Sequence, residues 1–180
     1  GPWRPSPTHG LSISPHGSLI LPLALALVLG SITPRSVASA AVGETPAGDE
    51  IAEKIAARDF RSAGTRLDSL LSVTPSGSPE RERYLLQRAV CWKNLGLEGE
   101  ALSGMEAAQG SFPELQEYLL FWEAECLEAL ERPDAASERY GLLIQRAPAS
   151  TMRDEARLRM ARIAEKAGRH EEAAKLFDRI

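Results

Sequence analysis

Apolar side chains recur at intervals of three and four residues along most of the chain, which is the spacing of one face of an α-helix. Three stretches show the pattern most clearly. Their apolar positions are Leu85, Leu86, Ala89, Trp92 and Leu95; Leu119, Leu120, Ala124, Leu127 and Leu130; and Leu158, Met160, Ala161 and Ile163. Val, Ile and Thr form no alternating runs, so no sheet is predicted.

These stripes and the breaks between them predict an all-α protein. The expected helices span about 50–57, 60–73, 80–95, 98–109, 114–130, 134–147, 151–166 and 170–180. Asp49 is expected to cap the first helix, because its carboxylate can accept hydrogen bonds from the free backbone N–H groups at a helix start.

Small residues repeat along the same region. Alanines stand twelve residues apart at Ala89 and Ala101, Ala124 and Ala136, and Ala161 and Ala173. Four residues after the second alanine comes a bulky side chain, which is Met105, Tyr140 or Phe177. Eight residues after that, the first two copies have Pro113 and Pro148. The second alanines lie 35 and then 37 residues apart, and a fainter copy precedes them around Ala63.

This pattern predicts stacked pairs of antiparallel helices. An alanine at a helix crossing lets two backbones approach closely, and a proline cannot continue a helix from within. Gly96 and Gly168 fall at the expected turns between paired helices, and Glu131 takes that place in the middle copy. One pair could not bury its apolar face alone, so the pairs are expected to share one elongated core.

The set of small, aromatic and proline positions resembles the tetratricopeptide family. The resemblance implies a tetratricopeptide-like right-handed solenoid of antiparallel helix pairs. Residues 50–180 would hold about four repeats, the last of them truncated, because Ile180 falls inside a helical pattern.

The N-terminal region has the pattern of a secretory signal. An apolar run from Leu19 to Gly30 is too short to span a membrane, which needs roughly 20 residues. Ala38 and Ala40 are the small residues that signal peptidase accepts. We therefore expect a signal peptide at 1–40, a flexible leader at 41–49, and a periplasmic or secreted protein. The alternative is an uncleaved membrane anchor.

The charge of the predicted mature chain excludes some partners. Removing residues 1–40 leaves 19 basic and 25 acidic residues, a net charge of −6. An acidic protein binds nucleic acid poorly, and no polybasic patch for anionic lipid is present. No nucleic-acid partner and no membrane insertion after signal cleavage are expected.

No residue pattern indicates a catalytic site, a cofactor or a metal centre. Glu123, Glu125 and Glu128 are interpreted as a solvated helix face, because nothing marks one of them as a general acid. His170 is the one histidine after residue 40 and is expected to be exposed in a turn, without ligand-spaced partners. Phosphate-loop, GxSxG and HExxH motifs are absent from the sequence.

Cys91 and Cys126 lie 35 residues apart, at the same position in successive repeats. An exported chain would allow them to form a disulfide. Equivalent helices in a solenoid pack about 8–10 Å apart, however, which favours two buried free thiols. Both alternatives stay open at this stage.

The aromatic residues also allow two interpretations. One is packing in the core between helices. The other is a patch that stacks on sugar or peptide ligands, because aromatic rings offer large contact areas with few torsions to freeze. The candidates for such a patch are Trp92, Tyr118, Phe121 and Trp122.

The stretch from Phe112 to Ala124 resembles the N-terminal superhelix of soluble lytic murein transglycosylases, with Glu117 where that family usually has Asp. The resemblance implies the non-catalytic arm of an enzyme that acts on peptidoglycan. It supplies no catalytic residue here. The alternative is a cell-envelope tetratricopeptide adaptor that binds protein partners.

Overall fold

The computed structural model describes residues 46–180, and this part of the chain is built from helices without strands. The helices are α2 (Pro46–Ala56), α3 (Phe60–Val73), α4 (Pro79–Asn94), α5 (Glu98–Ala108), a 3-10 turn η1 (Pro113–Leu115), α6 (Gln116–Ala129), α7 (Pro133–Arg146), α8 (Arg153–Lys166) and α9 (His170–Phe177). The predicted signal peptide and residues 41–45 of the predicted leader lie outside the described residues.

The structure confirms the predicted all-α fold class, and most helix boundaries fall within two residues of the expected ones. One difference concerns the first helix. It begins at Pro46, so Asp49 lies in its first turn and the predicted N-cap is wrong. Side-chain caps occur instead at the next two helices, where the N–H groups of Ser62 and Arg81 donate to Asp59 and Ser78, each at 3.2 Å.

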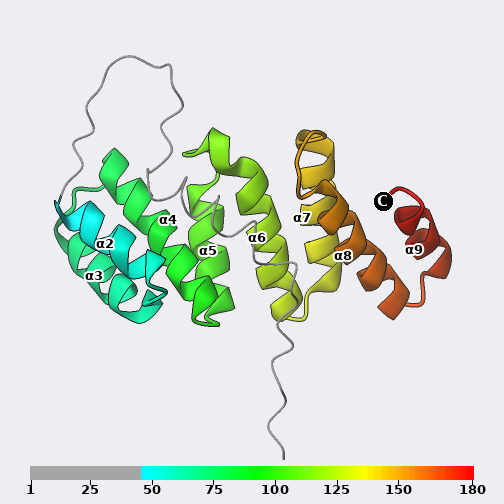
Figure 1. Ribbon diagram of the computed structural model, residues 1–180, viewed down its shortest axis with the longest axis horizontal. Coiled ribbons are helices and arrows are strands. Elements are labelled where there is room, and N and C mark those ends of the chain that lie inside the picture. Colours follow the sequence, from blue (N-terminus) through cyan, green and yellow to red (C-terminus); the bar gives the residue numbers. More distant parts are fainter. Residues whose placement is uncertain (1–45) are drawn as a thin grey trace, which may run out of the picture.

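The helices stand side by side in a row along the long axis of the molecule (Figure 1). Each one packs chiefly against the helices before and after it in the chain. We call α2, α4, α6 and α8 the first helices of the pairs, and α3, α5, α7 and α9 the second helices. The fold is therefore a helical solenoid, in which neighbouring pairs complete each other's core.

The turn inside each pair has the same backbone conformation. Gly96 and Gly168 adopt φ angles of 74° and 73°, as a tight helix end requires. The equivalent residues in the other two pairs are Arg58 at 59° and Glu131 at 57°. A non-glycine residue is rarely found in this left-handed region, so the pair packing imposes the turn even where the residue does not favour it.

Buried side chains form two clusters in the described part of the chain. The smaller cluster joins α2, α3 and α4 around Ile51, Ile55 and Leu67. The larger one runs from α4 to α8. The six alanines predicted to pack at helix crossings are all buried, at 0–4 % exposure, and the first four of them belong to the larger cluster: Ala89, Ala101, Ala124, Ala136, Ala161 and Ala173.

Two paired helices approach each other closely at Gly104, which the sequence pattern did not single out. A Cβ atom on Gly104 would lie 2.8 Å from Cβ of Ala89 on α4. Each Cβ atom is bonded directly to the Cα of its helix, so neither could move aside without shifting a helix. Gly104 thus sets the distance between α4 and α5.

Gly104→Ala is expected to destabilise the protein by about 1–3 kcal/mol, because the added methyl group overpacks the α4–α5 crossing. The matched control is Gly141→Ala in the middle of α7, where the added Cβ would make only an ordinary contact with Met160, at 4.0 Å. That variant should gain about 0.4–1 kcal/mol from reduced backbone freedom in the unfolded chain. Thermal and urea denaturation of both variants would measure the difference. Equal stabilities would contradict the assigned crossing.

Candidate functional site

The described residues show no arrangement typical of metal chemistry or of a membrane span. Within residues 46–180, no three or more His, Cys, Asp or Glu side chains gather as a metal site would need. In the same region, no helix combines the length and apolarity needed to cross a membrane. His170 is exposed at the start of α9.

The aromatic candidates lie mostly inside the solenoid. Tyr118, Phe121 and Trp122 on α6 are 8 %, 5 % and 3 % exposed. Tyr118 and Trp122 pack against each other with ring centroids 6.1 Å apart, and Phe121 meets Tyr140 of α7 edge-to-face at 5.5 Å. The three rings therefore pack in the core of the solenoid. Their proposed ligand-stacking role stays a prediction.

Trp92 differs from the other three aromatic candidates. It is half-buried on α4, and the Arg88 guanidinium lies 4.3 Å from the centre of its ring. Arg88 also forms an ion pair with Asp68 of α3 at 2.9 Å. This half-buried ring is thus already stacked against a cation from its own helix.

The two cysteines are free and buried. Cys91 belongs to the smaller core cluster and Cys126 to the larger one. Burial raises the pKa of Cys91 to about 12 and that of Cys126 to about 11. Both thiols therefore stay protonated at neutral pH and are poor nucleophiles and metal ligands.

The interpretation of the α6 carboxylates as a solvated helix face is wrong for Glu123. Its side chain is fully buried, although Glu125 and Glu128 remain partly accessible. The Gln109 amide, from the segment after α5, donates to both carboxylate oxygens at 2.6 and 2.8 Å. Burial raises the pKa of Glu123, against the lowering effects of the Gln109 hydrogen bond and the Arg139 charge.

Arg139 of α7 connects this buried carboxylate to the surface. Its Nε atom lies 3.0 Å from Oε2 of Glu123, without hydrogen-bond geometry, and its NH2 lies 3.4 Å from the Glu106 carboxylate of α5. Glu123 is therefore contacted from the segment after α5 and from α7. Because these contacts belong to two different helix pairs, they fix the position of one pair against the next.

A second polar network runs across the first helices. Lys93 of α4 forms an ion pair with Glu125 of α6 at 2.9 Å. Arg159 of α8 lies 3.4 Å from both Glu125 and Glu128, and 2.8 Å from Glu155 on its own helix. We call these five side chains the first-helix strip. All are partly buried, so water screens their interactions less than those of fully exposed pairs.

The strip is also tied to the core. The Tyr140 hydroxyl on α7 donates to Glu128 at 2.6 Å. Burial raises the Tyr140 pKa, and the Glu128 charge adds to that effect. Burial lowers the pKa of Arg159, but the Glu155 hydrogen bond and the surrounding charges outweigh this and raise it. Arg159 therefore keeps its positive charge throughout the physiological range.

The first helices alternate in charge along the solenoid. Counting Asp, Glu, Lys and Arg within the helix bounds, α2 carries −2, α4 +2, α6 −4 and α8 +2. The strip joins α4, α6 and α8 through pairs of opposite sign. Electrostatics thus supports the observed order of neighbours, since like-charged helices in these places would repel.

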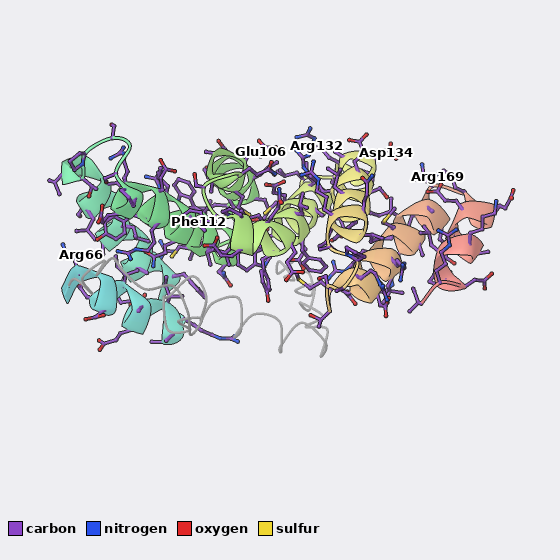
Figure 2. The ribbon with its side chains drawn as sticks, turned by 90° about the horizontal axis from the view of Figure 1, so that it is seen from above. Arg66, Glu106, Phe112, Arg132, Asp134 and Arg169 are labelled. Atoms are coloured by element: carbon purple, nitrogen blue, oxygen red, sulfur yellow. The ribbon has the colours of Figure 1, made fainter. Side chains whose placement is uncertain are left out.

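The second helices carry a separate and more exposed set of ion pairs. Glu106 of α5 pairs with Arg139, and Asp134 of α7 pairs with Arg169 at 3.3 Å. Figure 2 shows Glu106, Asp134 and Arg169 along one edge of the molecule. Because these pairs are largely exposed, each contributes at most about 1 kcal/mol.

Sequence reasoning missed Gln109 and Arg139 and misplaced Glu123. One signal was available, because Glu123 stands midway between Leu119 and Leu127 at helical spacing and so interrupts an apolar stripe. No comparable signal marks Gln109, which lies outside the regular helix.

Comparisons with known proteins agree with this architecture. Residues 155–180 match the model of a tetratricopeptide repeat family. The structure is similar to a solved structure of MamA (MamA AMB-1 C2221), with a TM-score of 0.60 and 13 % sequence identity over 90 % of this chain and 88 % of that chain. No curated protein matches the sequence. The protein is thus a helical-repeat protein of the tetratricopeptide type in its fold.

Glu123→Gln should change how stability depends on pH. The folded-state pKa of Glu123 is raised above its ordinary value of 4.5, so the folded protein holds this proton more tightly than the unfolded chain does. Ionisation of Glu123 therefore lowers stability as pH rises from 4.5 to the raised pKa. Gln removes this dependence, and Arg139 keeps its pairing with Glu106.

Melting temperatures measured between pH 4 and 8 would test this. The melting temperature of the Glu123→Gln variant, relative to that of the wild type, is expected to increase as pH rises through this window. Exposed Glu165→Gln on α8 controls for the loss of a surface carboxylate. A difference that does not vary with pH would contradict the assigned burial of the charge.

Proposed function

We propose that this protein is a binding scaffold, an adaptor that holds protein partners along its row of first helices. The observation that carries the proposal is the first-helix strip, where partly buried charges of both signs from α4, α6 and α8 line up across three helix pairs. A partner segment lying across these helices would meet alternating charges in a fixed order. Fixed charges of this kind select partners more than they add affinity.

The described chemistry supports binding rather than turnover. The buried carboxylate is held by an amide and a guanidinium and has no route to a substrate, and both thiols are buried with raised pKa values. The described chain thus offers a rigid surface more than a reaction centre. In a solenoid, such a surface extends over several repeats and suits extended partners.

The peptidoglycan hypothesis has less support. The stretch that resembles lytic transglycosylases, from Phe112 to Ala124, forms η1 and most of α6, and its three aromatic rings that follow Glu117 lie in the core. Core packing alone accounts for these residues. A glycan-binding arm and an envelope location remain predictions, which sedimentation of the protein with purified peptidoglycan would test.

Site-specific photocrosslinking would test the binding face. A photoreactive residue is placed at Ala129, which is exposed one turn after Glu125 on α6, or at Ala107, which is exposed on the second helix α5. Crosslinking in extracts of the source cells should give a defined protein product from position 129 and not from position 107. The same product from both positions, or none above background at 129, would contradict the proposal.

A further inference from the structure

A pocket opens at the junction of the third and fourth helix pairs, between the turn that joins α6 to α7 and the end of α8. These two segments lie at the same end of the row of helices (Figure 1). The volume of the pocket is about 350 Å³, near the lower limit of the roughly 300–1,000 Å³ typical of ligand sites. It therefore suits one long side chain of a protein partner. The pocket is lined by Glu128, Glu131, Pro133, Ile163, Lys166 and Ala167.

The lining combines apolar surface with an excess of carboxylates over amines. Glu128 belongs to α6 and Glu131 to the turn after it, whereas Lys166 is the last residue of α8. The other three lining residues are apolar, and Ile163 among them is buried at 5 % exposure. An arginine side chain matches this combination, because it has an aliphatic stem and a cationic end.

Glu128 is held in place by groups outside the pocket lining. Its carboxylate accepts a hydrogen bond from the Tyr140 hydroxyl at 2.6 Å and lies 3.4 Å from the Arg159 guanidinium. Arg159 also pairs with Glu125 and Glu155, so three carboxylates share its one positive charge. Glu128 is thus fixed in position without being fully neutralised, and a fixed group loses little conformational freedom when it binds a ligand.

The backbone at Glu131 is a second, independent observation. Its φ angle is 57°, where the equivalent turn residues Gly96 and Gly168 have 74° and 73°. A side chain in this left-handed region carries a conformational cost that glycine avoids. Arg58 adopts the same conformation in the first turn, so the strain alone does not mark a site. At Glu131, however, the strained residue also lines the pocket beside Glu128.

The preceding junction has a different charge at the same register. Lys93 stands 35 residues before Glu128, and Gly96 stands 35 residues before Glu131. Lys93 would repel a cation there, and Gly96 offers no carboxylate. The two acidic side chains therefore belong to the junction of the third and fourth pairs and not to the repeat pattern.

We propose that this pocket binds an arginine side chain of the protein partner. The arginine stem packs on the apolar lining, and its guanidinium faces the carboxylates of Glu128 and Glu131. A planar guanidinium with five N–H donors suits two carboxylates better than a lysine ammonium does. The inference rests on the proposed function and deepens it, since Glu128 also belongs to the first-helix strip.

An NMR titration of the full chain labelled with ¹⁵N tests the site. The probe is N-acetyl-arginine amide, and the matched control is N-acetyl-citrulline amide, which has nearly the same shape without the charge. The arginine compound should give saturable shift changes at the amides of residues 130–132 and 166–168. The citrulline compound should bind about two- to fivefold more weakly, which is the range expected for a partly exposed ion pair.

Three variants separate the role of the carboxylate from effects on folding. Glu131→Gly should remove the preference for arginine over citrulline, while the melting temperature stays equal or rises because glycine suits the turn. Glu138→Gln, an exposed carboxylate on α7, is the control and should leave the preference unchanged. Lys166→Ala should leave arginine binding equal or stronger, because it removes a like charge from the pocket.

Each of three results would overturn the inference. The first is no saturable shift at these amides, and the second is equal affinity for the two compounds. The third is weaker binding in Lys166→Ala with no change in Glu131→Gly, since it would show that the pocket prefers an anion. The titration contains no partner protein, so its failure leaves the crosslinking at position 129 to decide the proposed function separately.

Discussion

The structure depends on each second helix being covered by the first helix of the next pair. Met105 and Tyr140 are completely buried because α6 and α8 lie over them, whereas Phe177, at the same register, is 41 % exposed. Burying a large apolar side chain contributes about 1.5–3 kcal/mol, so a pair without its neighbour would lose much of its stability. The small residues at the crossings make this packing possible, and Gly104 shows how closely α4 and α5 approach.

Polar groups also stabilise the junctions between successive pairs. Glu123 is buried at the junction of two pairs, where an unpaired carboxylate would be strongly unfavourable, and Gln109 and Arg139 compensate it from neighbouring helices and segments. The first-helix strip adds ion pairs of alternating sign between α4, α6 and α8. The short connecting segments already fix the order of the pairs, and the polar contacts add specific links across their junctions. The resulting charged face is the basis for the proposed binding function.

The sequence was sufficient for the helices, the pairing and the register, because periodic apolar residues and recurring alanines reflect packing that is nearly the same in every pair. It was insufficient where one pair departs from the others. Glu123 occupies a position that Arg88 and Met160 hold in the neighbouring pairs, and its burial depends on Gln109 and Arg139, which are distant in the chain. Likewise, Tyr118, Phe121 and Trp122 could not be assigned to core or surface from periodicity, since α6 carries apolar residues around most of its circumference. Nothing in the described residues bears on the predicted signal peptide.

Native-state hydrogen exchange of the full chain tests most directly whether the pairs depend on their neighbours. If they do, amides of α6 and α7, which are covered on both sides, exchange most slowly, and protection decreases towards α9, whose outer face is open. Protection in α9 equal to that in α6 would contradict this account, because among the described helices only α8 packs against α9.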